Sequence, residues 1–275
     1  QDRGLIRYLM RHRHTTPFEM VEFKFHCKMP IFVARQWVRH RTANINEYSL
    51  RYSEARDEFY MPDPEHIQFQ SALNKQGRMG EVPIELKQKV LDSFKEISER
   101  SFAIYSELNE AGVARELARS ILPVNLYTEW YWKNDLHNLL HFVGLRSDSH
   151  AQYEIRVFSD AMAESVKAVA PFAWEAYQDY VVNGMRFSRI EQSLLEKNLP
   201  HRVIEDIGED IAYQLTATLH AAKPREEADL YSLYQKQSGS DSELDFKLKW
   251  DSGEIEIGNI RELREFKEKL MSLKN

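Results

Sequence analysis

The densest group of chemically useful side chains lies between Arg39 and Ser53. These fifteen residues include three arginines, one histidine, one glutamate and two serines. Guanidinium groups bind phosphates and carboxylates through paired hydrogen bonds. Ser49 beside Arg51 would complete an anion site, and Glu47 would accept hydrogen bonds from a ribose or a base. The alternative is a solvated, charged loop with capping serines, because short charge clusters usually lie on the surface.

A second group of polar residues runs from Leu145 to Arg156. Arg146 stands just before an expected helix, for which Ser149 is a candidate N-cap. The start of a helix attracts anions because its first backbone N–H groups lack partners within the helix. This group therefore indicates an anion site that contains Arg146. A capping box with salt bridges is the alternative.

Two histidines form a third candidate. His137 and His141 are four residues apart and share one face of an expected helix. This spacing allows metal binding, so a metal-dependent hydrolase is an alternative function. No HExxH pattern accompanies the pair, which favours hydrogen bonding to a ligand or to the core. Ser49 is a weak nucleophile candidate, because it lacks the flanking glycines of a nucleophile elbow.

Charge and composition narrow the function classes. The 275 residues carry a formal net charge of −6, which counts against a nucleic-acid-binding module that uses Arg35, Arg39, Arg41 and Arg51. The single cysteine, Cys27, excludes an internal disulfide and favours a reducing, cytoplasmic compartment. No apolar run reaches the length of about 20 residues that crosses a membrane.

The spacing of apolar residues predicts an α+β fold with more helix than sheet. Alternation from Val21 to Cys27 predicts a strand over residues 20–28. Helical spacing continues through residues 84–111, and Gly112 closes this long helix. Asp135 is a good N-cap for a later helix. Helices are also expected at residues 4–12, 30–39, 114–122, 135–145, 149–170 and 171–183, and a second strand at 125–132.

Residues 185–275 have a different pattern, which predicts a C-terminal α/β extension of unknown role. A helix is expected over 204–221, a Ser/Gly-rich linker over 235–243, a hairpin over 244–257 and a final helix over 259–274. The sequence thus predicts two parts. Residues 1–184 form a helix-rich catalytic core with a small antiparallel sheet, and residues 185–275 form the extension.

The run from Arg39 to Ser53 resembles the signature of flavin-dependent thymidylate synthases, R-H-R-x-x-S-x-N-E-x-S-x-R-Y-S. The sequence departs from this signature at Asn44, where serine is usual. Further matching segments extend the resemblance over residues 1–184: His14–Glu19, Arg35–Trp37, Ala118–Pro123 and Leu145–Gln152.

The resemblance implies an enzyme that makes dTMP from dUMP. Methylenetetrahydrofolate would supply the one-carbon unit, and reduced FAD, regenerated by NADPH, would supply the hydride. No enzyme nucleophile attacks the pyrimidine in such enzymes, which agrees with the buried position expected for Cys27. The resemblance also implies a homotetramer whose active sites combine residues of several subunits, with no role for nucleic acid or a membrane.

The family's site residues carry over to matching positions of this chain. The dUMP site would comprise Gln36, Trp37, Val38, Arg39, Glu47, Tyr48, Ser49, Leu50, Arg51, Arg119 and Arg146. The FAD site would comprise Thr16, Arg39, His40, Arg41, Glu47, Asp135, Leu136, His137 and His141. Arg146 is the expected catalytic residue, because a permanent cation beside the uracil stabilises negative charge that develops on the ring. No metal site is expected.

Overall fold

The computed structural model describes residues 2–72, 77–198 and 266. The chain divides into two units, one of residues 9–183 and one of residues 1–8 together with 184–275. In the second unit, α9 (Arg189–Asn198) begins with a capping box, in which Ser188 and Glu191 each accept a hydrogen bond from the other's backbone N–H. The helix, linker, hairpin and final helix expected after residue 203 lie outside the described residues. The boundary at residue 184 stays a prediction.

An antiparallel sheet of three strands forms the centre of the first unit. Its order is β1 (Glu22–Pro30), β5 (Tyr127–Asp135) and β2 (Asn44–Glu47). β1 pairs with β5 along its whole length, from Glu22 opposite Asp135 to Pro30 opposite Tyr127. The predicted strand is confirmed, but it lies two residues later than residues 20–28. Phe23, Cys27 and Met29 are buried, and the lysine and histidine side chains between them are exposed. Val21, predicted to share the buried face, precedes the strand and is 40% exposed.

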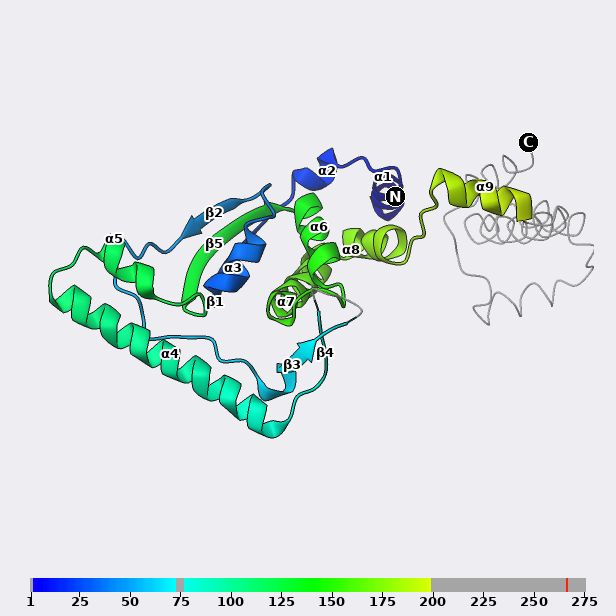
Figure 1. Cartoon of the computed structure of the whole chain (residues 1–275). Helices are drawn as coiled ribbons and strands as arrows, with labels where there is room; N and C mark the ends of the chain where they lie inside the picture. Colours follow the sequence, from blue (N-terminus) through cyan, green and yellow to red (C-terminus); the bar gives the residue numbers. More distant parts are fainter. Residues whose placement is uncertain (1, 73–76, 199–265, 267–275) are drawn as a thin grey trace, which may run out of the picture. The chain divides into compact units, whose positions relative to one another are not determined.

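Aromatic side chains fill the space between this sheet and two helices. Trp37 ends α3 (Ile31–Trp37), which lies across the sheet in Figure 1. Its ring packs against Trp130 and Trp132 of β5 and against Phe142 of α6 (Leu136–Arg146), with centroid distances of 5.0–5.5 Å. All four side chains are at most 1% exposed. Close packing of this kind holds the last turns of α3 and α6 in fixed positions.

Of the helices after β5, α6 begins where the sequence predicts and the next helix does not. Asp135 caps α6 by accepting a hydrogen bond from the backbone N–H of Asn138. α7 (Tyr153–Val169), α8 (Pro171–Tyr177) and a π-helical turn, η3 (Gln178–Val182), follow. The predicted start of α7 near Ser149 is wrong, because Gln152 precedes the helix and residues 147–152 form an irregular connection.

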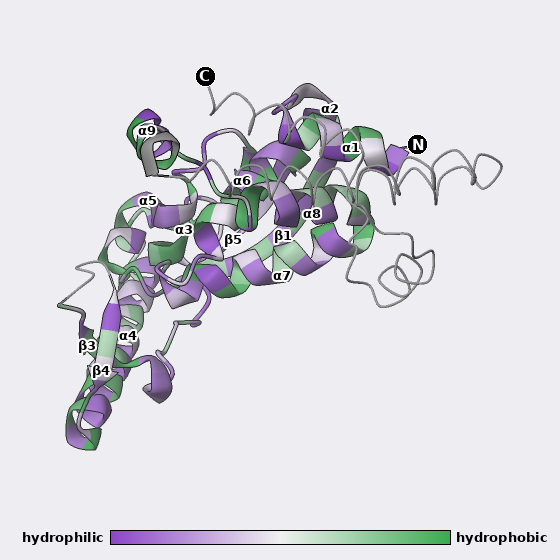
Figure 2. Cartoon of the chain, turned by 90° about the vertical axis from the view of Figure 1, so that its right-hand side faces the viewer, coloured by the Kyte–Doolittle hydropathy of each residue, from purple (hydrophilic) through white to green (hydrophobic). Residues whose placement is uncertain are grey.

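A second apolar cluster joins the long helix to the rest of the unit. α4 (Ile84–Glu110) is followed by Gly112 at φ 82°, as the sequence predicts. Its Tyr105 packs with Ala55, Ala118 and Leu126. Figure 2 shows hydrophilic and hydrophobic residues side by side along α4, as expected for a helix with one packed face. α5 (Arg115–Ala118) and a 3₁₀ turn, η2 (Arg119–Ile121), come next and end before a proline.

Several short elements were not predicted. β2 is one of them, and a two-stranded hairpin of β3 (Gln68–Gln70) and β4 (Arg78–Glu81) is another. A 3₁₀ turn, η1 (Pro64–His66), precedes the hairpin, and α2 (Thr16–Glu19) follows α1 (Asp2–Arg11). In the part of the chain that the structure describes, no helix has the length and apolar character needed to cross a membrane.

Candidate active site

The two polar groups of the sequence meet at Arg146 and His40. Arg146 ends α6, and His40 follows α3 by three residues, so the aromatic core positions both. The Nε of Arg146 donates a hydrogen bond of 3.0 Å to Nε2 of His40. The His40 ring also lies edge-on to Phe142, with a centroid distance of 4.9 Å. The residue pair is 106 positions apart in sequence, so only the fold brings it together.

The contact fixes the protonation of His40. Burial, with the positive charge of Arg146 next to it, lowers the pKa of His40 to about 4. The ring is therefore neutral at pH 7, accepts at Nε2 and carries its proton at Nδ1. A neutral imidazole can receive the guanidinium hydrogen bond without repelling it.

We expect this histidine to make stability depend on pH. The unfolded chain has a histidine pKa near 6.5, so between pH 7 and 5 it binds a proton that the folded chain does not bind. The free energy of unfolding should therefore fall as the pH falls, and the His40 share should be about 1–2 kcal/mol. Urea unfolding of wild type and His40→Gln at both pH values measures this share. Equal losses in the two proteins would contradict the assignment.

The end of Arg146 is available for a ligand. The side chain is half-buried, and burial lowers its pKa while leaving it charged at pH 7. The contact to His40 uses Nε, and among the described residues Nη1 and Nη2 have no hydrogen-bond partner. The prediction that Arg146 precedes a helix start is wrong: Arg146 ends α6, where the helix dipole stabilises a cation. The ligand-binding capacity thus comes from the free guanidinium nitrogens and not from a helix N-terminus.

A glutamine pair extends this part of the site. Gln36, in the last turn of α3, donates from Nε2 to Oε1 of Gln152, which precedes α7. We call Gln36, His40, Arg146 and Gln152 the Arg146 group. All four side chains are partly buried and come from the helix ends that the core holds in place.

Three residues of the signature, Glu47, Ser49 and Arg51, lie in a second set of contacts. Thr128 donates to Oε1 of Glu47 over 2.7 Å, and Ser49 accepts a weak 3.4 Å bond from the backbone N–H of Arg51. The Arg51 guanidinium contacts Glu116 of α5 at 3.3 Å. We call these five residues the Arg51 group. Both partners of the ion pair are exposed, so a phosphate could replace Glu116 at small cost.

The other predicted dUMP residues differ in how exposed their side chains are. Trp37 is fully buried, so its side chain belongs to the core and only its backbone could reach a ligand. Val38 is exposed, as are Arg39 and Tyr48, whereas Leu50 and Arg119 are partly buried: their side chains remain candidates. No hydrogen bond or ion pair within residues 2–72 and 77–198 links the Arg146 group to the Arg51 group.

The comparisons decide the family. The family model described as thymidylate synthase complementing protein matches residues 1–172. A flavin-dependent thymidylate synthase from Rickettsia conorii (strain ATCC VR-613 / Malish 7) is 54% identical over 202 residues, which cover 69% of this chain and 69% of that protein. The chain belongs to the flavin-dependent thymidylate synthase family. Another member, from Ehrlichia ruminantium (strain Gardel), is 51% identical over 216 residues, or 78% of this chain and 70% of that protein.

Solved structures agree with membership of the flavin-dependent thymidylate synthase family. The UMP/dUMP methylase PolB from Streptomyces cacaoi, bound with 5-Br UMP, matches with a TM-score of 0.61 and 36% identity, covering 64% of this chain and 81% of that one. A second structure of PolB, bound with 5-Br dUMP, matches with a TM-score of 0.58. The α+β fold predicted from the sequence is confirmed.

Flavin-dependent thymidylate synthases use FAD, and the donor set near His40 fits such a cofactor. The neutral His40 ring faces His141 at a centroid distance of 6.1 Å, and Arg41 is exposed beside it in sequence. Aromatic rings suit an isoalloxazine, and a guanidinium suits a pyrophosphate. His137 is partly buried and Thr16 is exposed, so both remain candidates.

Two predicted FAD residues are already engaged. Both carboxylate oxygens of Asp135 accept hydrogen bonds from Asn138, one from its backbone and one from its side chain. Leu136 is buried at 2% exposure, and its backbone N–H donates to the carbonyl of Val21. Contacts from these two residues to FAD would need to use their remaining acceptors. The described residues contain no cluster of three or more potential metal ligands.

Three contact residues escaped the sequence analysis. Gln152 binds Gln36, Glu116 binds Arg51 and Thr128 binds Glu47. Gln152 closes the segment Leu145–Gln152 that resembles flavin-dependent thymidylate synthases, so that segment was the available signal. Glu116 and Thr128 stand in no motif, and only the fold shows their partners.

Proposed function

We propose that this protein makes dTMP from dUMP as a flavin-dependent thymidylate synthase. The observation that carries the proposal is the Arg146 guanidinium, which is held at Nε by a neutral His40 and whose outer nitrogens have no hydrogen-bond partner among residues 2–72 and 77–198. A guanidinium in this state is suited to a planar, polar ring edge. Beside the uracil, it would stabilise negative charge that grows on the ring as carbon five becomes nucleophilic.

The phosphate of dUMP would bind the Arg51 group. A dianion requires more than one cation, and Arg51 and Arg119 would provide two. The Ser49 hydroxyl and the backbone N–H of Leu50 would add neutral donors. Arg39 and Glu47 would contact the sugar, and Glu47 is already oriented by Thr128.

The remaining chemistry would come from the cofactor and cosubstrates. FAD, when bound and reduced, supplies the hydride. We propose methylenetetrahydrofolate as the one-carbon donor and NADPH as the reductant. A cysteine nucleophile is disfavoured, because burial raises the pKa of Cys27, the only cysteine, to about 11. The cytoplasmic location remains a prediction.

We also propose a homotetramer with shared active sites. The reason is the separation of the site into an Arg146 group and an Arg51 group, which no contact within the described chain joins. In a shared site, the Arg51 group of one subunit would complete the Arg146 group of another. A symmetric oligomer can satisfy this pairing at every site.

The proposed function has a direct test. Purified protein is examined for flavin absorption and then incubated with dUMP, methylenetetrahydrofolate and NADPH. We expect dTMP formation that depends on all three and on FAD. A flavin-loaded protein that oxidises NADPH and binds dUMP but forms no dTMP would overturn the proposal.

Ser49 offers a second test of the phosphate assignment. We expect Ser49→Ala to weaken dUMP binding by about 1.5–3 kcal/mol, the value of a hydrogen bond to a charged group, while part of kcat survives. Calorimetric titration with dUMP and steady-state kinetics measure the two effects. If turnover disappears while dUMP affinity stays unchanged, Ser49 acts as a nucleophile and the phosphate assignment is wrong.

A further inference from the structure

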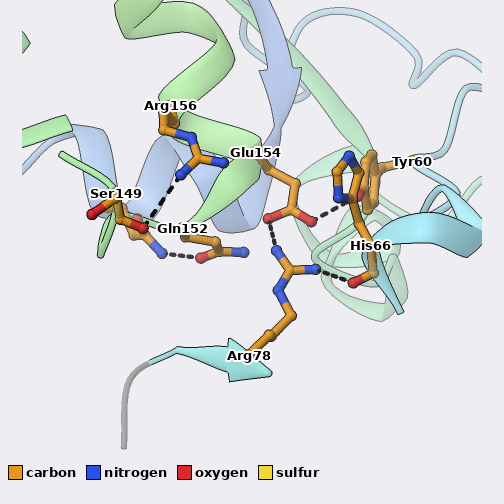
Figure 3. A network of polar contacts seen from close by, with 8 residues as sticks. Tyr60, His66, Arg78, Ser149, Gln152, Glu154 and Arg156 are labelled. Carbon is orange, nitrogen blue, oxygen red and sulfur yellow. Dashed lines mark hydrogen bonds and ion pairs between the residues drawn. The ribbon is translucent and has the colours of Figure 1, made fainter. Parts of the chain in front are cut away.

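A buried carboxylate lies directly behind the Arg146 group. Glu154, in the first turn of α7, is only 6% exposed. The Tyr60 hydroxyl donates to one of its oxygens over 2.8 Å, and Nη2 of Arg78 donates to the other over 2.6 Å. Arg78 comes from β4 and also donates to the backbone carbonyl of His66. Figure 3 shows Glu154 between these partners on one side and Gln152 on the other.

This environment keeps Glu154 ionised. Burial alone would raise the pKa of Glu154. Hydrogen bonds from Arg78, Tyr60 and its own backbone N–H, with a smaller contribution from Gln152, outweigh burial and leave the pKa below its ordinary value. The dipole of α7 adds to this effect, because Glu154 lies in the first turn. An ionised carboxylate can only accept hydrogen bonds.

The charge of Glu154 therefore sets the orientation of two amides. Gln152 must turn its NH₂ toward Glu154, and Figure 3 shows its amide nitrogen on that side. Its Oε1 then faces Gln36 and accepts from Gln36 Nε2. Gln36 is left with its carbonyl oxygen and one N–H for a ligand. Without the carboxylate, either amide could flip and exchange acceptor for donor.

We propose that Glu154 is a positioning residue that fixes, through Gln152, the amide orientation of Gln36 in the dUMP site. The proposal rests on the proposed function, in which Gln36 contacts dUMP. Arg78 balances the buried charge, so the β3–β4 hairpin takes part in shaping the site. Because Glu154 is buried and both its oxygens are bound by Tyr60 and Arg78, its removal should affect dUMP binding and not the chemical step.

The first measurement compares Glu154→Gln with wild type in dTMP formation. We expect the KM for dUMP to rise about three- to tenfold, the scale of one misdirected hydrogen bond, with kcat within about twofold and flavin content unchanged. Glu164→Gln, an exposed position on the same helix, is the matched control and should behave as wild type. A lower kcat at unchanged KM would overturn the proposal.

A double-mutant cycle separates positioning from general damage. In a Gln36→Ala background, Glu154→Gln should change the KM for dUMP by less than about twofold, because its route to the substrate is gone. If the fold-changes in KM caused by Gln36→Ala and Glu154→Gln multiply in the double variant, the two residues act independently and the proposal is overturned.

A second variant covers the case in which Glu154→Gln does not fold. Gln152→Met removes the amide between Glu154 and Gln36, while Tyr60 and Arg78 still hold Glu154. An unchanged KM for dUMP in Gln152→Met would overturn the proposal. Failure of wild type to form dTMP would instead refute the proposed function.

Discussion

Replacing Arg146 with alanine is expected to lower kcat for dTMP formation by about 10²–10³, the loss caused by removing one preorganised donor to a developing negative charge. Arg146 is held at Nε by His40, so in the proposed site its outer nitrogens would meet the uracil without reorganisation. An interaction that strengthens as the charge develops affects kcat when it is removed. The dUMP phosphate should still bind, because in the proposed site Arg51 and Arg119 would provide that charge.

The two half-reactions distinguish this role from a flavin role. Oxidation of NADPH by the Arg146→Ala enzyme without nucleotide should continue, since that step does not involve the uracil. Arg146→Lys is the informative companion, because it keeps the charge but loses the planar pair of donors and the Nε bond to His40. Loss of NADPH oxidation with normal dTMP formation from pre-reduced enzyme would place Arg146 at the flavin and contradict the assignment.

Elements with a strong apolar pattern could be predicted from the sequence. Alternating residues gave β1, helical spacing with Gly112 gave α4, and the capping carboxylate of Asp135 gave α6. β2 has no such pattern, since all four of its residues are exposed. It forms a strand because β5 offers a free edge. The paired residues are 83 to 89 positions apart, from Glu47 opposite Trp130 to Asn44 opposite Lys133, so the pairing leaves no local signal.

The misplaced start of α7 also has a physical cause. Asp148 and Ser149 have the residue types of an N-cap, but Asp148 accepts from the backbone N–H of His150 and so stabilises a local turn. Ser147 bonds Ser159 instead of a helix end. Short polar side chains serve turns as well as caps, so the sequence alone could not choose between them.

The site was predictable in its residue types and not in its pairings. The signature from Arg39 to Ser53 indicates anion binding, because its side chains have that chemistry wherever they lie. The bond between His40 and Arg146, and the lowered pKa of His40 that follows, depend on how α3 and α6 end beside each other. Such contacts are set by the tryptophan core, which a linear motif does not encode.

Mixing two inactive variants is expected to restore activity if the sites are shared. Arg146→Ala removes one half of a site and Arg51→Ala the other, so each variant alone should form almost no dTMP at a dUMP concentration near the wild-type KM. In a proposed shared site, one subunit contributes the Arg146 group and another contributes the Arg51 group. When the two variants mix at random, each of these two groups is intact in about half of the sites. About a quarter of the sites are then complete, so about a quarter of the wild-type activity should return.

The mixed tetramers can be made by co-expressing the variants with different affinity tags and purifying on both tags. Co-expression of two differently tagged Arg146→Ala chains is the control, and it should recover nothing, because every site then lacks the same guanidinium. Size-exclusion chromatography with light scattering reports the assembly in both samples. If the mixed assemblies are as inactive as their parents, Arg146 and Arg51 act within one chain, and the proposal of shared sites is wrong.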